Sequence, residues 1–267
     1  MDTPVLNRSL DVAPWLDPVA WRLPGTRPLD PADWLRVSDA FQGQMALRDG
    51  MIENRRDEVH ALLPQARLAA EECLDLVLEH CADQAEYEVG HGRVRRPDGV
   101  EVALSRADPL LTIGRLVQED VCILQDTGGD EHVLTGAILC FPASWTLSEK
   151  IGRPLTRIHR PVDSYGDEVA SRVQRMFDRM RPETPLWRAN ALIYDHPRLF
   201  SPKREASGDR HMSGDGRYLR SERQTLRKLP GSRAVVFTIH TVLVALDDLT
   251  PEARATLTRV THGRDRT

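Results

Sequence analysis

The sequence predicts an α+β fold in which helices come first and a mainly antiparallel sheet follows. Residues 31–81 carry helical patterns with interruptions, whereas the chain beyond Tyr87 is dominated by short strand-like runs and turns. Apolar runs on either side of turn signals are typical of antiparallel hairpins. The regular alternation of strand and helix that marks a dinucleotide-binding fold is not present in the sequence.

The N-terminal part is expected to be helical after an extended lead-in. Residues 1–30 are rich in Pro, Trp and Asp and form this lead-in, and residues 31–262 are expected to form one domain. Asp30 is suited to cap a helix with Pro31 at its first position. Further on, apolar residues recur at spacings of three and four, which predicts an amphipathic helix facing a core. These residues are Ala66, Ala69, Ala70, Cys73, Leu74, Val77, Leu78 and Cys81.

The middle of the chain is expected to form two hairpins and a short helix. Residues 96–99 (RPDG) are a turn signal between two short strand-like runs. A helix is expected over residues 108–117. Residues 121–125 and 132–141 are apolar runs around a Gly-Gly turn, which predicts the second hairpin.

The C-terminal part is expected to complete the sheet. Its elements are a helix over 166–180, a strand over 187–194, a polar loop over 196–217, a hairpin of 218–229 with 234–246, and a closing helix over 250–261. The second run of the hairpin, AVVFTIHTVLVAL, is β-branched and apolar, as strands are. The polar loop is long enough to act as a lid or a partner contact.

Composition and motifs exclude several classes of protein. A net charge of −4 argues against a general nucleic-acid binder, which needs a basic surface. No apolar run approaches the roughly 20 residues of a membrane span, and the N-terminus does not resemble a secretory signal. The four cysteines form no C-x-x-C pair, so reduced thiols in a cytoplasmic protein are expected. Neither a nucleotide-binding glycine motif nor a G-x-S-x-G elbow is present.

His159 lies in an unusual sequence context. The residues before it are interrupted by Gly152 and Pro154, and Pro161 follows, so a long helix is not expected. An imidazole on such a segment can be held with one ring nitrogen directed at a haem iron. The alternatives are a surface histidine and a hydrogen-bonded structural histidine.

Five segments, in this order, resemble the haem-dependent oxidative N-demethylase α-subunit-like family. They are ALRDGMIENRRDEVHALLP (46–64), RLVQEDVCIL (115–124), CFPASWTLSEKIGRPLTRIHRPVDSY (140–165), LWRANALIYD (186–195) and LRSERQTLRKLPGSRAVVFTIHT (219–241). The resemblance covers about residues 30–250. It implies a PAS-like antiparallel sheet core with N-terminal helices and an inserted helix, which binds haem b.

The resemblance also implies an activity and partners. The characterised enzyme of the family oxidises dimethylamine with O2 to methylamine and formaldehyde. Its electrons come from NADPH through flavin and iron–sulfur subunits, and a folate-binding subunit takes the formaldehyde. This chain is then expected to be the haem subunit alone, acting on a small methylated amine, without nucleic acid or membrane. The alternatives are a haem-based sensor or gas-binding protein, and a haem oxygenase that acts on a larger N-methylated substrate in a biosynthetic pathway.

The resemblance carries a haem ligand and further haem contacts onto this sequence. The I-H-x-P-V motif falls on residues 158–162 and implies His159 as the axial ligand. Trp145 and Lys150, just upstream, are expected to line the haem pocket. Arg220 and Arg223 lie in a region with an excess of positive charge and are expected to bind haem propionates or a redox partner, unless they pair with acidic residues of neighbouring strands. In a strand, alternation places Arg220, Glu222 and Gln224 on one face and Arg223 on the other.

Three residues are expected to take part in catalysis, and a fourth departs from the family pattern. Arg188 and Asn190 share one face of a predicted strand and are expected to polarise O2, orient an amine or satisfy backbone groups. Glu222, by its place in the motif, is the expected acceptor for the protonated amine. Family members often have F-T-I-R-T-Y in the last strand, where this chain has F-T-I-H-T-V. His240 therefore replaces an arginine and is the second choice for a haem ligand.

Overall fold

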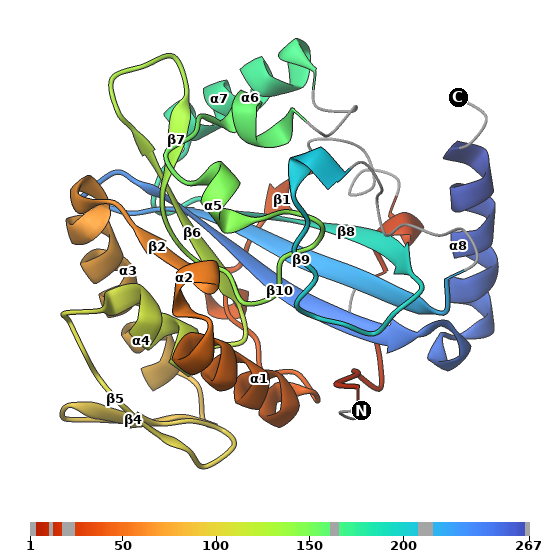
Figure 1. The fold of residues 1–267 in the computed structure, drawn as a ribbon, viewed down its shortest axis with the longest axis horizontal. Helices are drawn as coiled ribbons and strands as arrows, with labels where there is room; N and C mark the ends of the chain where they lie inside the picture. Colours follow the sequence, from red (N-terminus) through yellow and green to blue (C-terminus); the bar gives the residue numbers. More distant parts are fainter. Residues whose placement is uncertain (1–3, 11–12, 18–24, 161–165, 208–215, 265–267) are drawn as a thin grey trace.

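The structure is a computed structural model and describes residues 4–10, 13–17, 25–160, 166–207 and 216–264 (Figure 1). The α-helices are α1 (Phe41–Asn54), α2 (Arg56–Val59), α3 (Arg67–Ala82), α4 (Pro109–Leu116), α5 (Leu147–Lys150), α6 (Leu155–His159), α7 (Asp167–Arg179) and α8 (Pro251–Arg264). The strands are β1 (Arg27–Pro28), β2 (His60–Leu62), β3 (Glu88–Gly90), β4 (Arg93–Arg95), β5 (Glu101–Ala103), β6 (Asp120–Asp126), β7 (His132–Ile138), β8 (Leu186–Tyr194), β9 (Tyr218–Lys228) and β10 (Val235–Ala245). Short 3-10 helices are η1 (Pro14–Leu16), η2 (Pro31–Asp33), η3 (Pro64–Ala66), η4 (Glu205–Ser207) and η5 (Leu246–Asp248).

A seven-stranded antiparallel sheet lies at the centre of the protein, in the order β1-β8-β9-β10-β6-β7-β2 (Figure 1). The hairpin of β6 with β7 and the hairpin of β9 with β10 confirm two predictions. The predicted hairpin around residues 96–99 is also confirmed, but β3, β4 and β5 form a separate small sheet. The predicted α+β class is therefore correct.

The register of the central strands fixes which side chains share a face. Arg188 of β8 lies opposite Gln224 of β9, and Asn190 lies opposite Glu222. Residues that lie opposite each other in an antiparallel pair project from the same face of the sheet. The predicted alternation within β9 is confirmed, because Arg223 pairs with His240 of β10 and projects from the other face.

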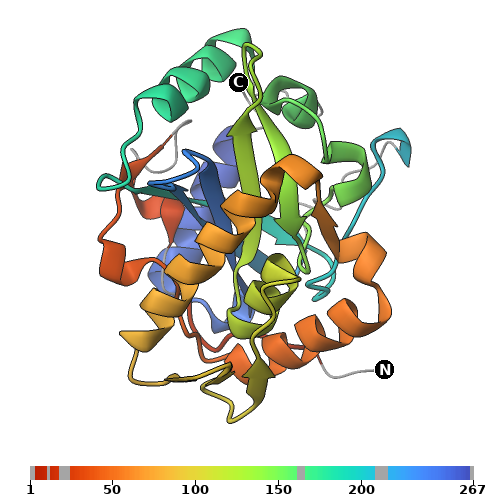
Figure 2. The same ribbon diagram turned by 90° about the vertical axis from the view of Figure 1, so that its left-hand side faces the viewer.

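Helices α1, α3 and α4 pack against one face of the sheet, and Figure 2 shows α3, coloured orange to gold, lying across the strands. The predicted amphipathic helix is α3, and its apolar stripe is buried as expected. Gly114 allows α4 to approach the sheet closely, since a Cβ there would lie 2.5 Å from Cγ1 of Ile138. This core buries Ala70, Cys73, Leu74, Val77, Val121, Ile123, Ile138 and Val236. Each large apolar side chain buried in this way contributes about 1.5–3 kcal/mol to the driving force for folding.

Helices α5, α6 and α7 are inserted between β7 and β8 and pack against the opposite face of the sheet (Figure 1). The predicted helix over 166–180 is α7, in which Phe177 is the buried residue. Phe177 and Leu155 of α6 share a core with the sheet residues Cys122, Leu124, Leu134, Leu226 and Val235. The inserted helices therefore cover this face of strands β6, β9 and β10.

Two short strands differ from the expected structure. β1 belongs to the predicted extended lead-in, but it pairs with β8, with Arg27 opposite Trp187. β2 interrupts the expected helical region and pairs with β7, with Leu62 opposite Gly136. Both strands are held by partners more than 70 residues away, which local sequence patterns do not encode.

Several expected features lie outside the described residues. They include Pro161 and Val162 of the histidine segment and residues 208–215 of the predicted polar loop. No helix within the described ranges is long and apolar enough to cross a bilayer.

Candidate functional site

A row of polar side chains crosses the face of the sheet that carries α5, α6 and α7. Arg220, Glu222 and Gln224 alternate along β9, and Arg188 and Asn190 lie beside them on β8. Arg220 is 1% exposed, Glu222 6% and Gln224 8%, while the two β8 residues are partly buried. Buried polar groups need hydrogen-bond partners. We call these five residues the polar row. The hydrogen bonds among them show which polar groups have a partner within the protein and which can bind a ligand.

Glu222 is at the centre of the polar row. Arg220 Nε donates a hydrogen bond to Oε1 at 3.1 Å, and the amides of Asn190 and Gln224 donate to Oε2 at 3.2 Å and 3.1 Å. Arg220 forms an ion pair with Glu222 and also donates to the main-chain oxygen of Leu199 at 2.8 Å. A carboxylate has about four lone-pair sites. Glu222 thus retains the capacity to accept one more hydrogen bond.

Arg188 is a charged residue of the polar row that forms no ion pair with any described residue. Its Nη1 donates to Gln224 Oε1 at 3.0 Å, but its Nε is shielded from solvent and has no hydrogen-bond partner. Burial lowers the pKa of Arg188, and the charge of Glu222 opposes this shift. Oδ1 of Asn190 is likewise shielded and without a hydrogen-bond partner. A polar ligand beside Arg188 and Asn190 would satisfy this donor and this acceptor.

His159 ends helix α6, on the same side of the sheet as the polar row. Its Nδ1 lies 2.9 Å from the main-chain oxygen of Leu155. A carbonyl oxygen can only accept, so Nδ1 carries the proton and Nε2 carries the lone pair. Burial lowers the pKa of His159, the hydrogen bond to Leu155 opposes this, and the charges of Lys150 and Arg188 lower the pKa further. The structure therefore favours a neutral imidazole with Nε2 as its electron-pair donor.

Lys150 and Trp145 support the segment that carries His159. Lys150 is 2% exposed, and its Nζ donates to the main-chain oxygen of Ile158 at 2.8 Å and also contacts the carboxylate of Glu205. Trp145 is partly buried and packs against the core shared by the inserted helices and the sheet. Lys150 therefore fixes the end of α6, next to the expected haem ligand.

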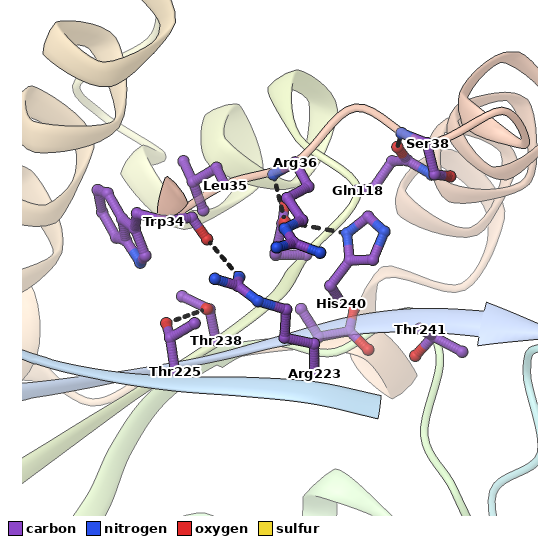
Figure 3. A network of polar contacts seen from close by, with 12 residues as sticks. Trp34, Leu35, Arg36, Ser38, Gln118, Arg223, Thr225, Thr238, His240 and Thr241 are labelled. Carbon is purple, nitrogen blue, oxygen red and sulfur yellow. Dashed lines mark hydrogen bonds and ion pairs between the residues drawn. The ribbon is translucent and has the colours of Figure 1, made fainter. Parts of the chain in front are cut away.

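His240 lies on the opposite face of the sheet, in a buried polar network under residues 33–38 (Figure 3). Its Nδ1 is 3.0 Å from Oε1 of Glu119, and both side chains are at most 2% exposed. The same oxygen accepts a hydrogen bond from the main-chain nitrogen of Arg36 at 2.9 Å. Burial raises the pKa of Glu119, but the attraction and hydrogen bond of His240, together with hydrogen bonds from the main-chain nitrogens of Arg36 and Glu119, hold that pKa below its ordinary value.

Arg223 belongs to the same network as His240 (Figure 3). Its Nη1 donates to the main-chain oxygen of Trp34 at 3.1 Å, and its Nη2 pairs with the carboxylate of Asp33 at 2.9 Å. Arg223 and His240 therefore hold residues 33–38 against the sheet. Both residues thus project from the face of the sheet opposite to Arg220 and Glu222, and the arrangement does not bring them together with His159. The physical reason is the period of two along a strand, which separates Arg223 from Arg220 and Glu222.

Gln224 is a member of the polar row for which no role is predicted from the sequence. The strand alternation placed it on the face of Glu222, but a neutral amide between charged residues forms no motif. The pairing with β8 shows its position: its oxygen accepts from Arg188 and its nitrogen donates to Glu222. Gln224 therefore fixes the orientation of both charged side chains.

The fold and the polar row together define an α+β protein with a candidate ligand site on the face of the sheet beneath the inserted helices. The haem-dependent oxidative N-demethylase, alpha subunit-like family matches residues 25–265. This match covers most of the chain, which therefore belongs to that family. The family's name describes haem-dependent oxidoreductases.

The residues on this face of the sheet fit a haem. A haem iron takes an imidazole nitrogen as its axial ligand, and Nε2 of His159 has the required lone pair. The apolar part of a haem suits the neighbouring side chains of Leu186, Leu226 and Phe237, which belong to the same core. Haem propionates are anionic, and the Nε of Arg188 is an unsatisfied donor beside this apolar surface.

Proposed function

We propose that this protein is the haem subunit of an oxidative N-demethylase, which uses O2 to oxidise a small methylated amine. The observation that carries the proposal is the gathering of His159, Arg188, Asn190 and Glu222 on the α5–α7 side of one sheet. These residues come from three segments separated in the sequence, α6, β8 and β9, and family membership alone does not bring them together. The antiparallel sheet with helices inserted between β7 and β8 supports the PAS-like fold that the resemblance implies.

His159 is proposed as the axial ligand of haem b. The hydrogen bond from Nδ1 to Leu155 holds the ring in one tautomer and increases the donor strength of Nε2. Lys150 fixes the carbonyl end of α6 and so restricts the position of the ligand. When bound, haem supplies the redox centre at which O2 is reduced and electrons leave the amine.

Glu222 is proposed to receive the amine. A small secondary amine is mostly protonated at neutral pH, so the site needs an acceptor for its N–H groups. Three donors hold the carboxylate of Glu222 in place, and its remaining lone pair can accept a hydrogen bond or a proton from the ammonium group. The unpaired Oδ1 of Asn190 offers a second acceptor beside it. Binding through these two oxygens would orient the methyl group of the amine.

Electrons are proposed to come from separate flavin and iron–sulfur subunits that use NADPH, with a folate-binding subunit as a further partner. The sequence of this chain contains no glycine-rich nucleotide motif and no C-x-x-C pair of its own. Both facts are consistent with NADPH, flavin and iron–sulfur sites that lie on separate subunits.

The test is O2-dependent release of formaldehyde by the haem-loaded protein. The protein is supplied with a chemical reductant and dimethylamine, and the wild type is compared with Asn190→Ala and Glu222→Gln. We expect formaldehyde from the wild type and a loss of at least tenfold in kcat/KM for each variant, equal to about 1.4 kcal/mol of transition-state stabilisation. Haem-loaded wild type that consumes no O2 with any methylated amine would overturn the proposal.

A further inference from the structure

We propose that Arg188 is a carboxylate-binding residue, so that the ligand which completes the polar row carries a carboxylate group. This carboxylate belongs either to a haem propionate or to the amine substrate itself. The inference deepens the proposed function and rests on it, because both place the ligand on the same face of the sheet.

The charge balance of this face leads to the proposal. Glu222 is neutralised by Arg220, with which it forms a buried ion pair at 3.1 Å. The carboxylate of Glu205 pairs with Lys150 and, at 2.9 Å, with Arg157. Arg188 makes no ion pair with any described residue, and its hydrogen-bond partner is the neutral amide of Gln224. Glu222 favours the charged form of Arg188, but that carboxylate already pairs with Arg220, so a ligand of negative charge would stabilise this partly buried cation.

The geometry of Arg188 favours a carboxylate over other acceptors. Gln224 is held at its nitrogen end by Glu222 at 3.1 Å, and its oxygen therefore holds Nη1 of Arg188 in a fixed position. The Nε of Arg188 remains an unsatisfied donor in the same guanidinium plane. A guanidinium presents parallel donors that match the two oxygens of a carboxylate. An ammonium group has the wrong sign of charge for this position, so dimethylamine alone does not satisfy Arg188.

The same arrangement suggests what kind of amine suits the site. Glu222 can accept a hydrogen bond from an ammonium group, and Arg188 can bind a carboxylate, while Gln224 is hydrogen-bonded to both side chains. A zwitterion with a methylated amine and a nearby carboxylate, such as an N-methylated amino acid, meets both requirements. If a haem propionate occupies Arg188 instead, the substrate needs only the amine.

The experiment compares binding by wild type, Arg188→Gln and Arg188→Lys. Haemin and haemin dimethyl ester, which has no free propionates, are titrated into the full chain and followed by absorption. N,N-dimethylglycine and dimethylamine are then titrated into the haem-loaded protein and followed by calorimetry. Arg181→Gln is the matched control, because Arg181 is exposed and lies just before the same strand.

Each source of the carboxylate predicts its own result. If a propionate binds Arg188, Arg188→Gln weakens haemin binding by about 10- to 100-fold, and the ester binds both proteins with the same reduced affinity. If the substrate supplies the carboxylate, haemin affinity is unchanged, whereas N,N-dimethylglycine binding falls by about 10- to 100-fold and dimethylamine binding does not. Arg188→Lys retains the charge without the planar fork and is expected to lie between wild type and Arg188→Gln.

The inference is overturned if Arg188→Gln and Arg188→Lys bind all four probes as the wild type does. It is also overturned if Arg181→Gln weakens the same probe as much as Arg188→Gln. A wild type that takes up no haemin contradicts the proposed function instead, and in that case N,N-dimethylglycine is titrated into the haem-free chain. Loss of that binding in Arg188→Gln then still supports a carboxylate site.

Discussion

Replacing Glu222 by Gln is expected to destabilise the fold as well as the site. The carboxylate is 6% exposed and is the counter-charge of Arg220, which is 1% exposed. Glutamine has nearly the same size, so no cavity forms, but the buried guanidinium loses its negative partner. The new side-chain NH2 meets a donor in either orientation of the amide: Arg220 at the position of Oε1, or the amides of Asn190 and Gln224 at the position of Oε2.

The size of the effect follows from the burial of the pair. Removing one partner of a buried ion pair costs about 3–5 kcal/mol, because the other charge is left uncompensated. The main-chain oxygen of Leu199 continues to accept from Arg220, which keeps the loss within this range. For a domain of this size, the melting temperature would fall by about 6–20 °C. Replacing both members, as Arg220→Met with Glu222→Leu, is expected to recover part of this stability.

Urea unfolding of the haem-free chain, followed by far-UV circular dichroism, measures this loss. Glu168→Gln is the matched control, since Glu168 pairs with Arg172 at 2.6 Å but both side chains are more than half exposed. An exposed pair of this kind contributes about 0.5 kcal/mol or less. The reasoning is refuted if Glu222→Gln is no less stable than Glu168→Gln.

Three further predictions concern the supporting structure. Asp120→Asn leaves the guanidinium of Arg48 uncompensated at a site where both side chains are 0% exposed, so a loss of about 3–5 kcal/mol is expected in thermal unfolding; an unchanged melting temperature would contradict this. Glu205 has a pKa lowered to about 2 by hydrogen bonds from Arg157 and Lys150, from an ordinary value of 4.5, so its stabilising effect is present above pH 4.5 and lost as the pH falls towards 2. The difference in urea midpoint between wild type and Glu205→Gln should therefore narrow below pH 4.5, and a constant difference would disprove the assignment. Arg188→Met removes a cation that has no ion-pair partner among the described residues. The free energy of unfolding of the haem-free chain should therefore stay within about 1 kcal/mol of wild type or rise. A loss of about 3 kcal/mol or more, on the order of that for a broken buried ion pair, would show that Arg188 is structural.

Much of the sheet could be predicted because its longest hairpin is encoded locally. The run over β10 is β-branched and apolar, and the turn before it contains Pro230 and Gly231, so pairing with β9 follows from adjacent sequence. The period of two along β9 also predicted correctly that Arg220 and Glu222 share a face. By contrast, β2 is three residues long and is defined by its pairing with β7, more than 70 residues later, which no local pattern encodes.

The candidate site was predictable in its residue types but not in its connections. Arg188, Asn190 and Glu222 were selected from strand patterns and the family resemblance, and the structure places them in one hydrogen-bonded row. The bridging role of Gln224 depends on the register between two strands, which sequence alone does not fix. His240 is the second choice for a haem ligand in the sequence, and only the fold shows that this residue faces Glu119 on the other side of the sheet.

Haem is proposed to bind on the α5–α7 side of the sheet, with His159 as its ligand. The most direct test is the absorption spectrum of haemin-titrated wild type, His159→Ala and His240→Ala, in the ferric and the dithionite-reduced states. We predict a saturable Soret shift in the wild type, its loss or displacement in His159→Ala, and a spectrum like that of the wild type in His240→Ala. An unchanged spectrum in His159→Ala, or a loss confined to His240→Ala, would contradict the assignment and place the haem elsewhere.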